Sequence, residues 1–298
     1  VCVLDVVEDL TPLREMEARL SQATGQGQIV GRSPAMEKLL RLVPVIAQHD
    51  SPVLITGETG TGKDLLAESV HKASPRSREP FVRFSCGPMP SELLDAELFG
   101  RVLDSAGELK PGRFQQAQGG TLYLSEIADL PLTQQSRLVR FLDEGTVLPV
   151  GAAKPVRVNA RIMASTAESP EKLVQDGRLR EDLFHRISAI RLHLPRLKER
   201  GEDLGFLLHH FLGHYAARFK KNITGISPKA LRLVCNHDFP GNVRELKNIM
   251  EFAVMICTGD KIRTEHLPGH LPGILEADLA ARPAGKGRKP GRNTTQER

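Results

Sequence analysis

A glycine-rich segment between a short apolar run and an apolar-faced helix constrains this chain more than any other feature. Residues 51–64 are SPVLITGETGTGKD, which has the Walker A spacing G-x-x-x-x-G-K. Glycines there allow backbone angles that other residues avoid, so successive amides turn inward and cradle phosphate oxygens. The lysine reaches the β- and γ-phosphates, and the helix N-terminus adds positive potential. The pattern predicts a nucleotide site made by Gly57, Glu58, Thr59, Gly60, Thr61, Gly62, Lys63 and Asp64.

The flanking sequence provides the context that such a loop needs. The apolar run 53–55 predicts a buried strand before it, and Leu65, Leu66, Ala67 and Val70 give the following helix an apolar face. A plain glycine turn with a surface lysine is the alternative, and this context argues against it. Asp64 departs from the general pattern, because a Ser or Thr hydroxyl usually follows the lysine and binds Mg²⁺.

The composition fits a globular protein with one sizeable domain and a smaller one. The chain has 298 residues, of which 40% are hydrophobic and 26% charged. No apolar run approaches the ~20 residues of a membrane span. The opening VCVLDVVEDL lacks the pattern of a signal peptide, and the four cysteines are far apart, so we expect a cytoplasmic protein with reduced thiols that is a piece of a longer chain. The net charge of +5 permits a nucleic-acid partner without arguing for one.

The order of expected elements predicts an α/β fold followed by an all-α region. Between residues 28 and about 195, strands and helices alternate, which is typical of a parallel sheet sandwiched by helices. Expected strands are 53–56, 81–85, 121–124, 161–165 and 189–194, and expected helices are 64–72, 91–99 and 131–142. Residues 202–267 are expected to be helical throughout. The predicted domains are 1–27 (the end of another domain and a linker helix), 28–197 (nucleotide-binding), 198–270 (helical lid) and 271–298 (flexible basic linker).

A second strand supplies the acidic side of the expected site. Residues 119–127 are GGTLYLSEI, an apolar run that ends in Ser125 and Glu126. P-loop enzymes place one acidic side chain there for Mg²⁺ and one that polarises the attacking water. Glu126 is therefore the predicted base, and Ser125 is a weak Mg²⁺ ligand that acts through water. The alternative is a buried strand whose exposed end is simply polar.

The chain resembles the central AAA+ domain of bacterial enhancer-binding regulators, the sigma-54-interaction family, along nearly all of residues 28–270. The resemblance implies a P-loop AAA+ fold with a lid, ATP or ADP with Mg²⁺, and a hexameric or heptameric ring. Residues 1–27 are similar to the end of a PAS sensor and its linker. The matching motifs are VGRSPAM (30–36), GETGTGKD (57–64), ELFG (97–100), GRFQQAQGGTLYL (112–124), LREDLFHRI (179–187), LPRLKERGEDL (194–204) and FPGNVRELKN (239–248).

The resemblance also assigns roles to three arginines. Arg180 and Arg186 match the arginine fingers that reach the γ-phosphate of a neighbouring subunit, and Arg244 matches the sensor II arginine that couples the lid to nucleotide. Guanidinium suits these roles because it stays charged and binds phosphate in a bidentate way. Without the family, each would be interpreted as part of a solvated helix face.

Four positions depart from the family pattern. Residues 101–111 (RVLDSAGELKP) replace the longer loop that carries a GAFTGA sequence and contacts sigma-54, and Ser125 replaces the Walker B aspartate. Ser85 and Ala167 stand where asparagines are expected. These changes predict a nucleotide-binding ring protein with weak hydrolysis that does not remodel sigma-54 polymerase. Two alternatives stay open: an active ATPase that activates sigma-54 polymerase, in which water compensates for Ser125, and a small P-loop kinase with Glu126 as base.

The expected partners follow from the same resemblance. They are further copies of the chain and DNA, the latter through a helix-turn-helix outside this sequence, with RNA polymerase left open and no membrane. Basic residues of the tail would add only phosphate attraction. These residues are Lys286, Arg288, Lys289 and Arg292.

Overall fold

The computed structural model describes residues 29, 31–103, 108–269 and 271. The described residues form two compact units, one made by those up to His210 together with Phe239–Lys247, and one made by Phe211–Asp238 together with those from Asn248 onward. The predicted strand and helix of residues 1–27, the predicted tail and the middle of the 101–111 loop lie outside the described residues.

The predicted domain boundary between residues 197 and 198 stays a prediction, and the first compact unit runs on to His210. One reason is Asp203, which is fully buried and accepts hydrogen bonds from the Ser33 backbone N–H and hydroxyl at 2.8 and 2.9 Å. A second reason is the turn at residues 239–244, whose backbone bonds the glycine-rich loop. Both segments thereby belong to the nucleotide unit.

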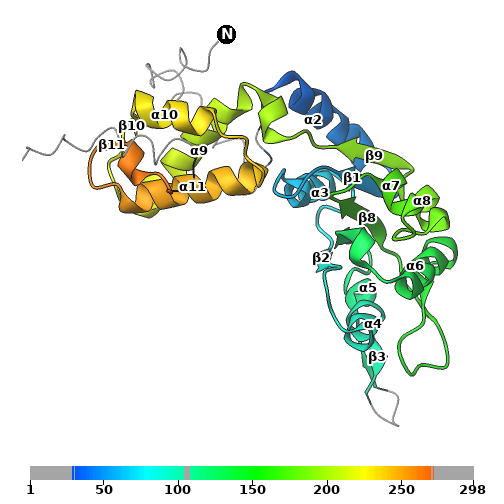
Figure 1. Cartoon of the computed structure of the whole chain (residues 1–298). Helices are drawn as coiled ribbons and strands as arrows, with labels where there is room; N and C mark the ends of the chain where they lie inside the picture. Colours follow the sequence, from blue (N-terminus) through cyan, green and yellow to red (C-terminus); the bar gives the residue numbers. More distant parts are fainter. Residues whose placement is uncertain (1–28, 30, 104–107, 270, 272–298) are drawn as a thin grey trace, which may run out of the picture. The chain divides into compact units, whose positions relative to one another are not determined.

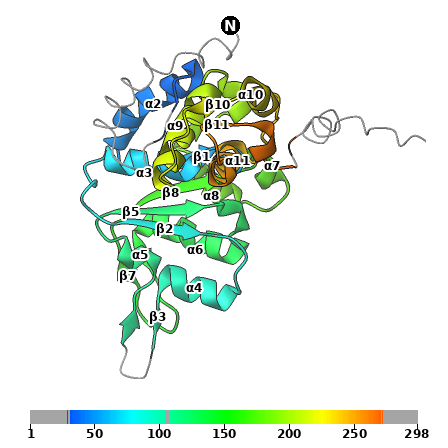
Figure 2. The ribbon, with the colours of Figure 1, turned by 90° about the vertical axis from the view of Figure 1, so that its left-hand side faces the viewer.

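The first unit contains the predicted parallel sheet, which confirms the α/β fold class. Its strand order is β2-β5-β8-β1-β9, every neighbouring pair is parallel, and Figure 2 shows β2, β5 and β8 side by side. Parallel strands place all their carboxyl ends at one edge. The strands are β1 (Val53–Thr56), β2 (Phe81–Ser85), β5 (Thr121–Ser125), β8 (Arg161–Thr166) and β9 (Ile190–His193).

Helices cover both faces of this sheet, so its central strands β1, β5 and β8 are almost wholly buried. One face, with Val53, Ile55 and Met163, packs against α2 (Pro34–Ala47) and α3 (Lys63–Lys72). The other face packs against the remaining helices of the unit (Figure 1). These are α4 (Ser91–Phe99), α5 (Arg113–Gln116), α6 (Leu132–Glu144), α7 (Pro170–Gln175) and α8 (Glu181–Ile187).

The described residues on either side of 104–107 form a short antiparallel strand pair. Strand β3 (Arg101–Val102) pairs with β4 (Leu109–Lys110), and the Val102 N–H donates to the Val150 carbonyl at 2.9 Å. A second antiparallel pair joins β6 (Thr146–Val147) to β7 (Val156–Arg157). The shortened segment thus keeps a strand pair at its base.

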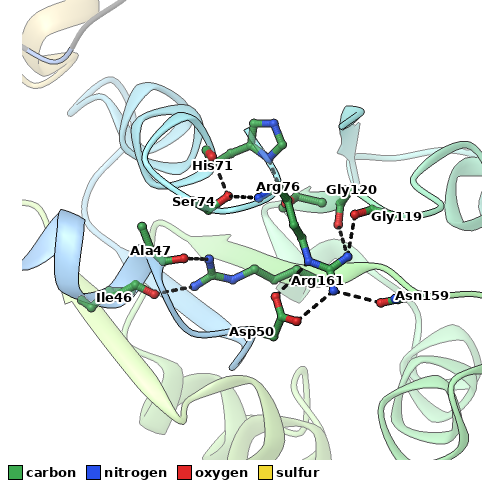
Figure 3. A network of polar contacts seen from close by, with 11 residues as sticks. Ile46, Ala47, Asp50, His71, Ser74, Arg76, Gly119, Gly120, Asn159 and Arg161 are labelled. Atoms are coloured by element: carbon green, nitrogen blue, oxygen red, sulfur yellow. Dashed lines mark hydrogen bonds and ion pairs between the residues drawn. The ribbon is translucent and has the colours of Figure 1, made fainter. Parts of the chain in front are cut away.

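A network of arginines lies at the amino edge of the sheet (Figure 3). Arg161 is 2% exposed, and its guanidinium donates to the carbonyls of Ile46 and Ala47 at 3.0 and 3.2 Å, at the end of α2. Burial lowers the pKa of Arg161. Arg76 donates to both carboxylate oxygens of Asp50 at 2.9 Å. The network satisfies carbonyls where α2 ends and the strands begin.

The second unit is mainly helical, but the prediction of an uninterrupted helical region is wrong. Strand β10 (Gly225–Ile226), which precedes α10, pairs in parallel with β11 (Lys261–Ile262), which follows α11, and the 3₁₀ turn η4 (Thr264–His266) comes next. The predicted helix start at Ser227 is confirmed, because its hydroxyl accepts from the Ala230 N–H at 3.4 Å. The helices of this unit are α10 (Pro228–Cys235) and the later parts of α9 (Asp203–Arg218) and α11 (Asn242–Ile256), whose first residues belong to the first unit. Among the described residues, no helix has both the length and the apolar character that crossing a bilayer requires.

Candidate nucleotide site

The glycine-rich loop between β1 and α3 adopts a conformation that only glycine tolerates at key positions. Gly57, Gly60 and Gly62 have φ values of 147°, 81° and 108°. A Cβ at Gly60 would lie 2.1 Å from the Gly241 carbonyl oxygen, and one at Gly57 would lie 2.7 Å from that of Leu194. The loop backbone is therefore set both by local dihedral freedom and by close neighbours.

Lys63 begins α3 and points back into the loop. Its side chain is 6% exposed, and Nζ donates to the Gly57 carbonyl at 2.8 Å and lies 3.1 Å from Glu126 Oε1. A buried ammonium needs such partners, because desolvation of an unpaired charge is costly. A phosphate oxygen could take the place of one of them. The lysine is thus positioned as the pattern predicts.

Glu126 follows β5 with a φ of 54°, an uncommon angle for a residue with a side chain. Its Oε2 accepts a hydrogen bond from the Ala167 backbone N–H at 2.9 Å, and its Oε1 faces Lys63. The structure therefore brings Glu126 to the loop, as expected. At the position where an asparagine side chain was expected, the Ala167 main chain makes the contact instead.

Ser125 ends β5, and its side chain bonds the neighbouring strand. Its Oγ donates to the Phe84 carbonyl at 3.4 Å, across the paired strands β2 and β5, whose register sets Ser85 opposite Ser125. The two serines that replace acidic and amide side chains thus end neighbouring strands. In the family pattern, position 85 is expected to be an asparagine and position 125 an aspartate. Both positions are serine in this chain, so neither the amide nor the carboxylate is present at this sheet edge.

Tyr123 is a site residue that the sequence analysis missed. It is 1% exposed, and its hydroxyl donates to Asp64 Oδ1 at 2.8 Å and lies 2.8 Å from Ser165 Oγ. Burial raises the pKa of Tyr123 above its ordinary value, so the hydroxyl keeps its proton. The bond fixes the Asp64 carboxylate in the first turn of α3. A polar aromatic residue two positions before Ser125 in an apolar strand was the available signal.

Arg200 is a second site residue that the sequence analysis missed, and it supports the glycine-rich loop by a hydrogen bond to the loop backbone. It is 1% exposed, its Nη2 donates to the Thr61 carbonyl at 2.8 Å, and its Nε donates to the Pro195 carbonyl at 3.1 Å. Burial lowers its pKa, and the nearby Asp203 opposes that shift. Arg200 is the last residue of the 3₁₀ helix η3 (Leu197–Arg200). Arg244 approaches the loop from the other side, where its N–H donates to the Gly60 carbonyl at 3.2 Å.

The two predicted finger arginines bond carboxylates of their own chain. Arg180 Nη2 lies 2.8 Å from Asp182 Oδ2, and Arg186 Nε lies 2.7 Å from Asp143 Oδ1. Both side chains are about two-fifths exposed, at 40% and 39%. These hydrogen bonds raise the pKa of each arginine. The structure thus places both on the surface of the first unit rather than bonding them to this chain's own loop.

An open cavity of about 450 Å³ adjoins the glycine-rich loop at the carboxyl edge of the sheet. Its walls come from the ends of β1, β8 and β9 and include Thr56, Gly57, Ala167 and His193. Ligand pockets commonly have a volume of ~300–1,000 Å³. The edge therefore offers both phosphate-binding backbone and room for a small ligand.

Comparison with known families gives matches to both parts of the chain. The model of the sigma-54 interaction domain matches residues 29–193, and that of the AAA+ ATPase lid domain matches residues 198–281. The first match covers more than half of the chain.

Individual relatives agree with these models. The Escherichia coli K12 regulator NtrC is 40% identical over 246 residues, which are 82% of this chain and 52% of that protein. ZraR of Salmonella typhimurium is 39% identical over 263 residues, 87% of this chain and 60% of ZraR. NtrX from Brucella abortus, solved in complex with ATP, has a TM-score of 0.77 at 33% identity, over 87% of this chain and 57% of NtrX. The chain thus spans only about half of these relatives' length.

Proposed function

Because the chain belongs to the family of sigma-54 interaction domains with an AAA+ lid, we propose that it is the ATP-binding AAA+ module of a bacterial transcription regulator. We further propose that it hydrolyses ATP weakly and does not remodel sigma-54 polymerase. The observation that carries the proposal is the contrast at one sheet edge. The glycine loop with Lys63 is intact, whereas the position of the Walker B acid is Ser125, bonded to Phe84.

Nucleotide binding rests on groups that are all present. The backbone amides of residues 58–63 would bind phosphate oxygens, and the Lys63 ammonium would exchange its present partners for the terminal phosphates. The N-terminus of α3 adds favourable potential. NtrX, whose fold matches this chain, was solved with ADP as well as with ATP. Binding therefore depends on the half of the site that follows the pattern.

The remaining donors also fit Mg²⁺. Among the described residues, no group of three or more His, Cys, Asp or Glu could hold a metal by itself. Mg²⁺ does not require one, because it is usually bound by one or two carboxylates with phosphate oxygens and waters. Asp64, fixed by Tyr123, supplies a carboxylate in the first turn of α3, and Ser125 supplies a hydroxyl at the end of β5. When bound, Mg²⁺ would neutralise phosphate charge.

Weak hydrolysis follows from what these residues do without a Walker B aspartate. Glu126 is the base in this proposal, and its carboxylate is shared between Lys63 and the Ala167 N–H. A serine beside it provides no negative charge to organise the transferring phosphoryl group. Single electrostatic contacts of this kind are worth roughly 2.7–4 kcal/mol in the transition state. Affinity for nucleotide depends less on them.

Assembly into a ring would bring the surface arginines into use. Arg180 and Arg186 are exposed and lie at the two ends of α8, away from this chain's own loop contacts. In the proposed ring they would exchange Asp182 and Asp143 for the γ-phosphate of a neighbouring subunit. The shortened segment that carries β3 and β4 supports the absence of sigma-54 remodelling, since residues 101–111 include no aromatic residue.

The binding part of the proposal is tested by calorimetry with Mg²⁺-ADP. We expect Lys63→Ala to weaken ADP binding at least ~10-fold, because a buried charge-assisted contact is lost. Lys72→Ala is the matched control, since Lys72 ends the same helix and pairs with Glu68 at 2.9 Å. Equal ADP affinities in the wild type and the Lys63 variant would show that the glycine-rich loop is not part of the nucleotide site.

The proposed absence of sigma-54 polymerase remodelling is tested by transcription in vitro. The full-length protein is added to sigma-54 polymerase on a sigma-54 promoter, with ATP turnover measured in parallel. We expect no ATP-dependent open complex and no stimulation of turnover by the polymerase. Open-complex formation would instead support the activator alternative. Phosphoryl transfer to a small molecule would support the kinase alternative.

A further inference from the structure

Asn242 makes three hydrogen bonds that join three separate segments of the first unit. Its Oδ1 accepts from the Leu197 N–H at 2.9 Å. Its Nδ2 donates to Glu58 Oε2 at 3.2 Å and to the Thr59 carbonyl at 3.1 Å. The residue is 1% exposed and has a φ of 51°, which asparagine tolerates better than most side chains. Two of these bonds end on the glycine-rich loop.

The same loop segment is bound from two further directions. Arg196 Nη2 pairs with Glu58 Oε1 at 3.0 Å, so the two carboxylate oxygens of Glu58 have different partners. The Gly60 carbonyl accepts from the Arg244 N–H at 3.2 Å. Glu58 itself lies in the Walker A spacing, between the first two of its glycines. The outer side of the loop is therefore attached to the first turn of α11 by side-chain and main-chain bonds.

This attachment is informative because of where α11 goes. Its first residues, up to Lys247, belong to the nucleotide unit, and from Asn248 the same helix belongs to the second unit. A change in the loop backbone on phosphate binding would act directly on the start of this helix. The reverse also holds, because coupling between two sites is reciprocal in binding free energy.

Building on the proposed nucleotide binding, we propose that the Asn242–Glu58 pair is a positioning contact that sets nucleotide affinity and reports nucleotide occupancy to α11. Asn242 touches no phosphate in this arrangement. It acts through Glu58 and the Thr59 carbonyl, which fix the loop in the conformation that directs its amides at phosphate. If Asn242 only stabilised the turn, a substitution of Glu58 would not change the effect of an Asn242 substitution on nucleotide affinity.

A double-mutant cycle tests the contact. Asn242→Asp keeps the acceptor for the Leu197 N–H and the tolerance for positive φ, but it removes both donors and sets a carboxylate against Glu58. We expect ADP affinity, measured by calorimetry with Mg²⁺, to fall at least ~10-fold. Glu58→Gln alone should cost about threefold or less, since its amide oxygen can still accept. In the double variant the introduced amide at position 58 can donate to the introduced carboxylate at position 242, while the Thr59 carbonyl still lacks its donor. Affinity should therefore recover in part, by at least about threefold relative to Asn242→Asp alone.

The outcomes are separable. If the wild type itself binds no ADP, the proposed function fails. If the wild type binds ADP and the two substitutions act additively, the proposed function stands and the positioning contact is refuted. Thermal unfolding of each variant shows whether the fold is kept.

Hydrogen–deuterium exchange provides a second test that does not need the Asn242 variant to fold. In the wild type, we expect ADP to slow amide exchange in residues 243–247. Glu58→Ala removes a side chain that is 39% exposed and should fold. In this variant, at ADP concentrations that saturate the site, we expect less than half of the wild-type protection. Unchanged protection would overturn the proposal, as would absence of protection in a wild type that binds ADP.

Discussion

The two edges of the central sheet each bury a basic side chain, and the difference between them separates function from stability. At the carboxyl edge, Lys63 is 6% exposed and contacts a side-chain carboxylate, that of Glu126, beside an open cavity. At the amino edge, Arg161 is 2% exposed and contacts the carbonyls of Ile46 and Ala47 at the end of α2. A buried cation next to movable partners can exchange them for a ligand, whereas one enclosed by helix carbonyls holds the fold together.

The neighbours of the two cations reinforce this contrast. Around Lys63, the loop backbone is held in conformations that favour glycine. Around Arg161, the ion pair of Arg76 with Asp50 is bidentate, and the Arg76 hydrogen bond lowers the pKa of the Asp50 carboxyl despite partial burial. We therefore expect substitutions at the two edges to have different readouts: nucleotide chemistry at one, unfolding at the other.

The largest effect is expected at the amino edge. Arg161→Met should lower the free energy of unfolding by about 3 kcal/mol, because the buried Ala47 carbonyl loses its side-chain donor. The Ile46 carbonyl loses this donor too and keeps backbone donors such as the His49 N–H. ADP affinity of the folded variant should stay within about threefold of the wild type. Denaturant unfolding and calorimetry measure the two quantities. Arg157→Met is the matched control, since Arg157 is exposed and should change stability by less than about 0.5 kcal/mol.

The proposed difference between the two sheet edges would be contradicted if Arg161→Met abolished ADP binding while the protein remained folded. Such a result would mean that the amino edge controls the site across the sheet.

The next effect concerns hydrolysis at the carboxyl edge. Ser125→Asp should raise the rate of phosphate release by about tenfold or more, since a carboxylate restores the charge that organises Mg²⁺ and the phosphoryl group. Unfolding should change little, because Ser125 is only half-buried. Ser85→Asp, on the neighbouring strand, is the control for added charge alone. A brisk wild-type rate that Ser125→Asp leaves unchanged would refute the proposed weak hydrolysis.

The smallest effect is a pH dependence at the amino edge. His71 is 4% exposed with Nδ1 3.0 Å from Thr121 Oγ1, and burial lowers its pKa below the usual 6.5. Below pH 6.5 the unfolded chain binds this proton more readily than the folded one. Its contribution to stability is therefore present above pH 6.5 and is lost as the pH falls through the folded-state pKa.

We expect His71→Gln to flatten the decline in unfolding free energy between pH 7 and about 5. The exposed His49 offers the control, and His49→Gln should keep the wild-type slope. Identical slopes in all three proteins would show that His71 does not titrate differently in the two states. Denaturant melts at several pH values provide the measurement.

The sequence by itself determined the parts of this protein that depend on local pattern. The Gly57–Lys63 spacing requires glycine dihedrals and a strand–helix junction, and both follow from neighbouring residues. The expected strands at 53–56 and 81–85 have the same bounds in the structure. The first is an apolar run in the middle of the sheet, and the second lies at the sheet edge with only Phe84 fully buried. The start of α10 at Ser227 followed from its capping pattern.

Only the tertiary structure decided which distant groups meet at the site. The contacts of Tyr123 with Asp64, Ala167 with Glu126, and Asn242 with Glu58 join residues that lie 59, 41 and 184 positions apart. No local pattern encodes such pairs, since they depend on strand order, on the register of β5 and β8, and on a turn that returns to the loop. The short pairing of β10 with β11 inside the helical region was likewise hidden, because two-residue strands carry no periodicity and form only when tertiary packing brings them together.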